Sequence, residues 1–300
     1  MPAWGRRRLP LRQYEQCRQL LDKELGLNLD PETVTLAGQI RRGGLTPAPR
    51  PAPLQREGIH TGTAPEKYTL PVQLTPFIGR RAELEEIGRL LADPACRLLT
   101  LMGPGGIGKT RLAIQVGLEL GERFSGGACF VPLVGVRSGE SILPAVGQAL
   151  GLTYDADRDL FQQVCQFLSW RQVLLILDNY EHLIGAESAA LPGELASAGA
   201  GVKVLVTSRQ SLNVQGEQLY QVGGMRLPDD SEPATSLPDL ENFSAVRLFL
   251  QCARRQRPDF ELDGSNSQSV LALCRLLQGM PLAIELAAGA GWACSLRPKS

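Results

Sequence analysis

The chain has 300 residues, of which 43% are hydrophobic and 21% are charged, as is usual for a globular protein with a real core. Its 31 Lys and Arg residues balance 31 Asp and Glu residues, which argues against a protein that coats nucleic acid or membrane. The 7 cysteines are odd in number and include no C-x-x-C pair, so we expect reduced thiols rather than a disulfide framework or a zinc site.

The first 74 residues predict a helical hairpin followed by a linker. Apolar residues at near-helical spacing predict a helix over 11–25, and Asp30 followed by Pro31 predicts a second helix that runs to about residue 42. We therefore expect the hairpin within residues 1–42. From residue 43 the sequence becomes rich in proline, which predicts an extended linker over 43–74 without a core of its own.

From residue 77 onward, short apolar strands alternate with amphipathic helices, a pattern typical of a parallel sheet built from βαβ units. The predicted strands are 97–102, 128–133, 173–177, 202–207 and 218–222. The predicted helices between them are about 109–120, 141–150, 158–169 and 188–198. Three more helices follow the last strand, at 241–256, 266–277 and 281–289. This pattern predicts an α/β core over 75–224 and a helical subdomain over 225–300.

No segment predicts a route into a membrane. The N-terminal arginines are not followed by an apolar segment of the kind found in signal peptides. The longest apolar stretch, 281–294, contains Glu285 and is shorter than the ~20 residues that span a bilayer. We therefore expect a cytoplasmic protein with no membrane partner.

The first predicted strand of the core runs into a phosphate-binding loop. The pattern G-x-x-x-x-G-K-[ST] is matched by Gly103-Pro104-Gly105-Gly106-Ile107-Gly108-Lys109-Thr110. Glycines let backbone N–H groups turn toward phosphate oxygens, and the N-terminus of the following helix adds its positive dipole end. Lys109 is expected to reach the β- and γ-phosphates, and the Thr110 hydroxyl is expected to ligate Mg²⁺. The sequence therefore predicts a nucleotide site.

Two further strands end in polar residues at the same predicted edge of the sheet. Five apolar residues over 173–177 deliver Asp178, an arrangement expected to hold Mg²⁺. The strand 202–207 leads to Arg209, which can sense a γ-phosphate and stabilise charge in the transition state, although a solvated surface arginine remains an alternative. No acid directly follows Asp178, so we expect slow hydrolysis. Asn179 and Glu181 are candidates to orient the attacking water, and we expect His182 to be a packing or capping residue of the loop.

Five segments in order resemble the STAND-class P-loop ATPases, with an NB-ARC-like ATPase domain, of bacterial transcriptional regulators. The segments are TPFIGRRAEL (75–84), the phosphate-binding loop, LLILDNYEH (174–182), VLVTSR (204–209) and QGMPL (278–282). The resemblance covers about residues 75–290 and implies a P-loop NTPase fold, with a five-stranded parallel sheet in the order 5-1-4-3-2. Arg81 stands where the family usually has Glu, and Met280 stands where it usually has Leu, changes that should not abolish binding.

The resemblance also implies that the ligand is ATP or ADP, in agreement with the absence of a guanine-reading [NT]-K-x-D motif. Residues 77–80 and 279–282 would enclose the adenine, with Pro281 packed on the base. The nucleotide-binding residues expected are Phe77, Ile78, Gly79, Arg80, Gly103, Gly105, Gly106, Ile107, Gly108, Lys109, Thr110, Arg111 and Pro281. The catalytic residues expected are Lys109, Asp178 and Arg209, and the metal ligands are Thr110 and Asp178.

By resemblance, the parent protein is a switch that ADP holds closed, that ATP opens for self-association, and that hydrolysis resets. Residues 12–42 resemble the end of a TPR-like bacterial transcriptional activator domain, which would contact other proteins. The winged helices that the family places upstream and downstream are missing from the sequence, so we expect a fragment that does not itself bind DNA. The alternatives are a fragment that acts only as a protein-interaction piece, and a metabolic P-loop ATPase or kinase.

Overall fold

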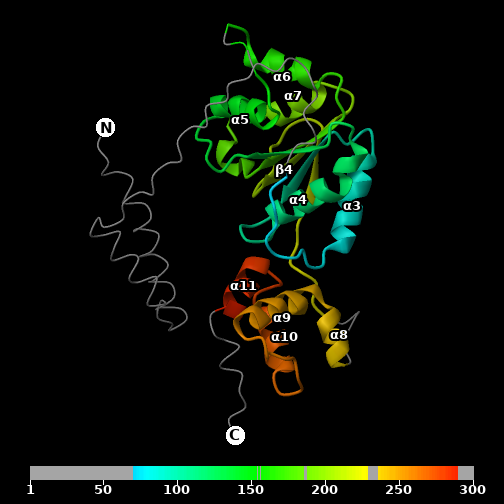
Figure 1. Cartoon of the computed structure of the whole chain (residues 1–300), viewed down its shortest axis with the longest axis vertical. Helices are drawn as coiled ribbons and strands as arrows, with labels where there is room; N and C mark the ends of the chain where they lie inside the picture. Colours follow the sequence, from blue (N-terminus) through cyan, green and yellow to red (C-terminus); the bar gives the residue numbers. More distant parts are fainter. Residues whose placement is uncertain (1–69, 154, 156, 186–187, 229–235, 290–300) are drawn as a thin grey trace, which may run out of the picture. The chain divides into compact units, whose positions relative to one another are not determined.

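The computed structural model describes residues 70–289, except for residues 154, 156, 186–187 and 229–235 (Figure 1). All of them belong to one of the two units of the chain, residues 64–300. The predicted helical hairpin over 1–42 lies outside the described residues. The same is true of residues 43–69 of the predicted linker over 43–74.

Five parallel strands form the central sheet. They are β1 (Leu98–Met102), β2 (Ala128–Pro132), β3 (Val173–Asp178), β4 (Val202–Ser208) and β5 (Glu217–Gln221). Their order is β2-β3-β4-β1-β5, which is the order implied by the resemblance read from the opposite edge. The expected α/β fold with C-terminal helices is therefore confirmed. Met102 of β1 pairs with Ser208 of β4, so the carboxyl ends of these strands lie at one edge.

The alternating side chains of the strands pack against helices on both faces of the sheet. Leu174 and Ile176 of β3 face α3 (Arg81–Ala92) and α4 (Lys109–Leu120). Leu175 and Leu177, on the other face, pack with α5 (Ile142–Ala149), α6 (Leu160–Leu168) and α7 (Leu191–Ser197). Figure 1 shows the two groups of helices on opposite sides of the sheet. Because β3 and β4 are covered on both faces, every residue in them is buried, whereas the edge strand β5 is more exposed and more polar.

Among the described residues, four helices follow the sheet and share a second core. They are α8 (Leu237–Asn242), α9 (Ser244–Gln256), α10 (Ser267–Leu276) and α11 (Pro281–Gly289). Phe249, Val270 and Ile284 are among the side chains buried between them. No helix among the described residues is long and apolar enough to cross a bilayer.

The helices differ from the predicted ones in two places. The predicted helix 241–256 is wrong at its start, because Phe243 has an extended backbone with φ −75° and ψ 130° and separates α8 from α9. The helix α3 was not predicted. Its first residue follows Arg80, which has a left-handed backbone and provides no side-chain cap, so the usual signal of a helix start is missing.

Candidate nucleotide-binding site

The phosphate-binding loop connects β1 to α4, as the motif predicts. The loop is held to the sheet by its first residue, since the backbone N–H of Gly103 donates to the carbonyl oxygen of Ser208 at 3.3 Å. The Lys109 side chain folds back over the loop, and its Nζ donates to the carbonyl oxygens of Gly103 at 2.7 Å and Pro104 at 3.1 Å. The Ile107 side chain packs into the core, so only its backbone is available to a ligand.

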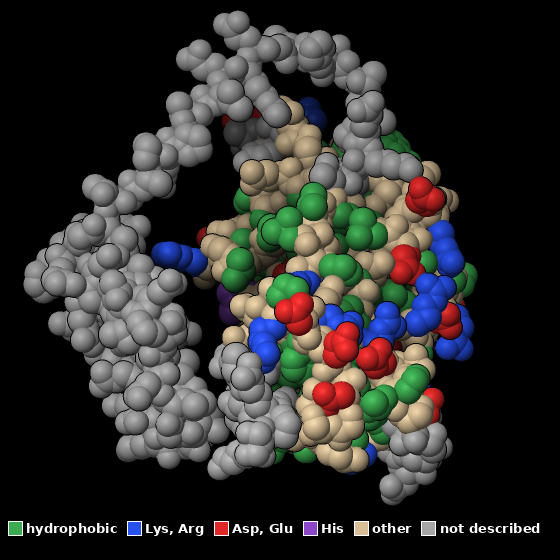
Figure 2. Space-filling model, turned by 60° about the horizontal axis from the view of Figure 1, so that its bottom comes forward, with side chains coloured by type: hydrophobic (Ala, Val, Ile, Leu, Met, Phe, Trp, Pro, Cys, Tyr) green, Lys and Arg blue, Asp and Glu red, His purple; other side chains and the backbone are tan. Residues whose placement is uncertain are grey.

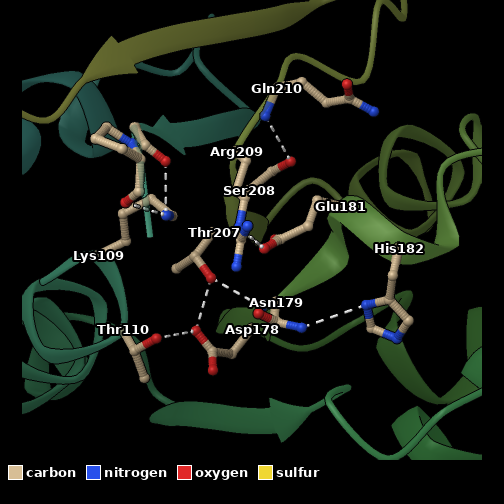
Figure 3. Close-up of polar contacts among 12 residues, drawn as sticks. Lys109, Thr110, Asp178, Asn179, Glu181, His182, Thr207, Ser208, Arg209 and Gln210 are labelled. Atoms are coloured by element: carbon tan, nitrogen blue, oxygen red, sulfur yellow. Dashed lines mark hydrogen bonds and ion pairs between the residues drawn. The ribbon is translucent and has the colours of Figure 1, made fainter. Parts of the chain in front are cut away.

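Lys109 is a buried residue, 9% exposed, and its ammonium lies in a cluster of charges. Burial lowers its pKa from the usual value. The negative charges of Glu181 and Asp178 oppose this effect, while the positive charge of Arg209 adds to it. The structure thus places Lys109, Asp178 and Arg209, the three predicted catalytic residues, in one electrostatic neighbourhood (Figure 3).

The predicted metal ligands are in direct contact. The Thr110 hydroxyl donates to Oδ1 of Asp178 at 2.8 Å, and the Thr207 hydroxyl donates to the same oxygen at 2.6 Å. Asp178 is buried, yet its carboxylate makes no ion pair with a cation of the described residues. A buried carboxylate without a direct ion pair, beside a threonine hydroxyl, is an oxygen-only donor set that suits Mg²⁺.

Asn179, next along the chain, faces away from this carboxylate. It has a left-handed backbone with φ 66°, and its N–H donates to Oγ1 of Thr207 at 2.9 Å. Its side-chain Nδ2 lies 3.3 Å from Nδ1 of His182, whose Nε2 lies 2.8 Å from the Val136 carbonyl oxygen. Because a carbonyl oxygen can only accept, Nε2 carries the proton and Nδ1 accepts from Asn179. The prediction that His182 packs or caps nearby agrees with these contacts.

Arg209 reaches the phosphate-binding loop from the end of β4. Its Nε lies 2.9 Å from Oε1 of Glu181. Its terminal Nη2 lies over Gly105, since a Cβ built on that glycine would be 3.3 Å from this nitrogen. Figure 3 shows the guanidinium beside the Glu181 carboxylate. Arg209 is therefore paired with a carboxylate, while 65% of its side chain is exposed.

The Arg80 side chain contacts three segments of the chain near the loop. Its side chain is buried, and Nη2 donates to the carbonyl oxygens of Ile107 at 2.8 Å and Gly223 at 3.1 Å. Nη1 lies 3.4 Å from the Glu83 carboxylate. Burial lowers the pKa of this guanidinium, which the Glu83 charge partly offsets. Sequence reasoning placed Arg80 beside the adenine, and the structure shows that it also supports the backbone of the phosphate-binding loop.

A mainly apolar pocket lies beside the loop. Its lining residues are Pro76, Phe77, Ile78, Arg80, Gly108, Arg111, Met225, Leu248, Pro281 and Glu285. Of the predicted adenine-side residues 77–80 and 279–282, the pocket lining includes Phe77, Ile78, Arg80 and Pro281, but not Gly79 or the other three residues of 279–282. A Cβ on Gly79 would be 2.4 Å from Cβ of Ser244, so this glycine permits close packing against α9 and does not line the pocket.

Arg111 and α11 form the walls of this pocket. The Arg111 Nη2 donates to the carbonyl oxygens of Thr75 at 2.9 Å and Pro76 at 3.0 Å. Its Nη1 lies 3.8 Å from the Glu285 carboxylate on α11. The start of α11 is held next to residue 225, because the Met225 N–H donates to the Gly279 carbonyl oxygen at 2.8 Å. Gly279 has φ 66°, and a Cβ there would be 2.4 Å from the Met225 oxygen, so only glycine fits.

Sequence reasoning missed several residues of the site. Met225, Leu248 and Glu285 line the pocket, and Thr207 bridges Asp178 and Asn179. Thr207 could have been found, because it ends a buried strand at the predicted edge. Met225 and Leu248 carry no local signal, since both belong to a hydrophobic core and only the fold exposes one side of them to the pocket.

Comparisons with known proteins agree with this geometry. Residues 93–213 match the family model of the AAA domain. A putative HTH-type transcriptional regulator of Mycobacterium tuberculosis, Rv0890c, is 36% identical over 64% of this chain and 20% of its own length. The regulatory protein AfsR of Streptomyces griseus is 30% identical over 95% of this chain and 27% of its own length. This chain spans between a fifth and a half of the length of the curated relatives it matches.

The structure is also similar to that of PH0952 from Pyrococcus horikoshii, a STAND protein with a tetratricopeptide repeat sensor. The TM-score is 0.46 and the sequence identity is 18%. The match covers 75% of this chain and 32% of that chain. The match to the AAA domain implies nucleotide binding. The expected relation to regulators is confirmed by the two sequence relatives. Residues 93–213 therefore form a P-loop ATPase domain of the AAA type, and the chain is related to the AfsR-like and HTH-type transcriptional regulators.

Proposed function

We propose that this chain is the adenine-nucleotide-binding switch module of a bacterial transcriptional regulator and that it hydrolyses ATP slowly. The observation that carries the proposal is the contact between Thr110 and Asp178 at 2.8 Å, beside a buried Lys109 on a glycine-rich loop. A phosphate chain, a divalent cation and a cationic side chain would meet at this point. The proposal includes the predicted domains: a helical hairpin over 1–42, a linker over 43–74, an α/β core over 75–224 and a helical subdomain over 225–300.

The contacts of Lys109 support its role toward phosphate. Its ammonium is bonded to two carbonyl oxygens of its own loop, which are neutral partners. Nucleotide phosphates would offer it charged acceptors, which form stronger hydrogen bonds than neutral ones. Thr110 and Asp178 would hold Mg²⁺, which supplies charge neutralisation of the β- and γ-phosphates when bound.

The pocket beside the loop supports adenine as the base. Phe77, Ile78 and Pro281 present apolar surface, and Gly108 connects this surface to the phosphate-binding loop. Such a surface suits the flat face of a base, as ligand pockets are mostly apolar with a few polar groups. The choice of adenine over guanine as the bound base rests on the family resemblance.

A switch needs contacts that differ between ADP and ATP, because a ligand that binds two states equally shifts neither. Arg209 lies over Gly105 and would be the contact that only ATP makes, through its γ-phosphate. Self-association in the ATP state, and protein partners that bind through the helical repeats, belong to the same proposal. We do not propose direct DNA binding, since the described face in Figure 2 carries Arg and Lys side chains interspersed with Asp and Glu.

Thermal unfolding with and without Mg-ADP, Mg-ATP and Mg-GTP tests the proposal. A ligand at 100 times its Kd stabilises a protein by about 2.7 kcal/mol, which is a shift of roughly 5–10 °C for a domain of this size. We expect this shift with the adenine nucleotides, a smaller one with Mg-GTP, and none in Lys109→Met. The matched control is Lys203→Met, which removes the other lysine that is buried in the described part of the chain. Lys203 lies near the start of β4, whereas the loop lies beside its end, and it donates to the Asp93 and Cys96 carbonyl oxygens.

The same unfolding experiment, together with an assay of ATP turnover, separates the alternatives. A cooperatively folding chain that shows no shift with any nucleotide would reject the switch and favour a protein-interaction piece. A shift together with ATP turnover above roughly 1 s⁻¹, within the usual range of enzymes, would favour a metabolic ATPase or kinase.

A further inference from the structure

The two oxygens of the Glu181 carboxylate have different surroundings. Oε1 accepts from Nε of Arg209 at 2.9 Å. Oε2 is buried and has no hydrogen-bond donor among the described residues. A carboxylate oxygen that is withdrawn from water without a donor is costly, so it requires an explanation, and a catalytic role or a bound water is one. This oxygen can therefore accept a hydrogen bond from a ligand or a water molecule.

Glu181 belongs to the phosphate-binding site and not to a separate surface cluster. Its partner Arg209 lies over Gly105 of the loop, with Nη2 directed there and Nε directed to Glu181. Among the charges that act on the Lys109 ammonium and raise its pKa, Glu181 has a larger effect than Asp178. The carboxylate thus lies at the end of the site where the γ-phosphate of ATP would lie.

The residue directly after Asp178 is not available for the same task. The Asn179 amide is directed to His182, and its backbone N–H is directed to Thr207. Asp178 itself already accepts two hydroxyl donors on Oδ1 and belongs to the metal-binding pair. Of the carboxylates around the loop in the described part of the chain, Glu181 is the one with a buried oxygen that has no hydrogen-bond donor.

We propose that Glu181 is the catalytic carboxylate for ATP hydrolysis, with Oε1 fixing Arg209 over the phosphate-binding loop and Oε2 accepting a hydrogen bond from the attacking water. This inference rests on the proposed function. The water oxygen forms a bond to the γ-phosphorus while the bond from that phosphorus to the bridging oxygen breaks, and its electron pair stays on ADP. The water proton passes to Glu181 and then to solvent, so the products are ADP, phosphate and a proton.

Glu181→Gln separates the two roles of the side chain. Arginine has no acceptor, so the glutamine must turn its carbonyl oxygen to Nε of Arg209 and place its NH₂ group where Oε2 was. Arg209 then stays fixed, but the water loses its acceptor. General-base groups contribute about 10²–10⁴-fold. We expect hydrolysis to fall by about 10²-fold or more, while the Kd values of Mg-ATP and Mg-ADP stay within about threefold of those of the unchanged chain.

Glu181→Ala removes both roles and completes the test. Hydrolysis should fall equally, and the preference for ATP over ADP should also weaken, because Arg209 is no longer held over the loop. The control is Glu194→Gln on α7, an exposed glutamate away from the loop, which should change neither quantity. Hydrolysis is measured in single turnover, and nucleotide affinity is measured by calorimetric titration on the same preparations.

Each outcome decides something different. If Glu181→Gln hydrolyses ATP within about threefold of the unchanged chain, Glu181 only positions Arg209 and the inference is wrong. If the unchanged chain binds Mg-ATP but does not hydrolyse it, the inference is also wrong, while the nucleotide site stands. If neither chain binds nucleotide, the proposed function itself fails, which the thermal shifts reveal independently.

Discussion

The backbone N–H of Leu282 donates to the carbonyl oxygen of Gly106, 3.2 Å away. This bond joins the first turn of α11 to the middle of the phosphate-binding loop. The Leu282 side chain also packs on the loop, because a Cβ built on Gly106 would be 3.0 Å from both Cβ and Cδ2 of Leu282. A change in the loop on nucleotide binding therefore reaches α11 without any intermediate residue.

Gly106→Ala should damage the loop in two ways. Gly106 has φ 80°, a conformation that costs a residue with a Cβ about 1–3 kcal/mol, and the added methyl group would press on Leu282. We expect a lower free energy of unfolding and no stabilisation by Mg-ADP, measured by urea unfolding with and without nucleotide. Gly264→Ala, at a site with open space and no positive φ, should stay within about 0.5 kcal/mol. Equal stability of the two variants would show that the loop tolerates a side chain at Gly106.

Thr207→Val should show how much the buried hydroxyl contributes to the site. The Thr207 hydroxyl donates to Asp178 and accepts the N–H of Asn179, and valine has nearly the same shape without either bond. Leaving a buried donor unpaired costs about 1–3 kcal/mol, and we expect that loss of stability in urea unfolding. Thr207→Ser keeps the hydroxyl and should lose less. If the serine variant is the less stable of the two, packing of the methyl group matters more than the hydrogen bonds.

The sheet and the phosphate-binding loop could be predicted because their signals are local. The run of apolar residues before Asp178 is continuous, as expected for a strand buried on both faces, and all six residues of β3 are buried. The motif that ends in Lys109 and Thr110 needs only a strand before it and a helix after it. The order of the strands came from the family resemblance, since local pattern does not determine which strands are neighbours.

The contacts between segments far apart in sequence could not be predicted. Arg80 bonds the carbonyl oxygen of Gly223, 143 positions away, and nothing near either residue indicates the other. The pairing of Arg209 with Glu181 is of the same kind, since it depends on how two strand ends are aligned. The start of α3 is a different case. Leu84, Ile87 and Leu91 have helical spacing, but Arg80 provides none of the usual capping chemistry.

Arg111→Met and Glu285→Gln should have unequal effects although the two residues are partners. Their ion pair spans 3.8 Å with both side chains at least one-third exposed, so its loss should cost at most about 1 kcal/mol. Arg111 also bonds the Thr75 and Pro76 carbonyl oxygens, beside the apolar wall of the pocket. We therefore expect Arg111→Met to cost about 1–3 kcal/mol and to weaken Mg-ADP binding severalfold. Urea unfolding and titration with Mg-ADP check this, and equal losses in both variants would contradict it.

Lys109→Met should not destabilise the nucleotide-free protein, although we expect it to abolish nucleotide binding. Burial lowers the Lys109 pKa below its usual 10.5, so the folded chain holds this proton more weakly than the unfolded chain. The charged ammonium therefore opposes folding at every pH below its lowered pKa, and this penalty fades as the pH rises toward 10.5. Without nucleotide at neutral pH, we expect Lys109→Met to unfold at the same temperature as the unchanged chain or up to about 2–4 °C higher, a gain of ~1 kcal/mol at most. The difference should shrink as the pH approaches 10.5, and other groups that titrate there affect both chains alike. A variant that unfolds several degrees lower at neutral pH would mean that the bonds from Lys109 to the Gly103 and Pro104 carbonyl oxygens outweigh the burial of its charge.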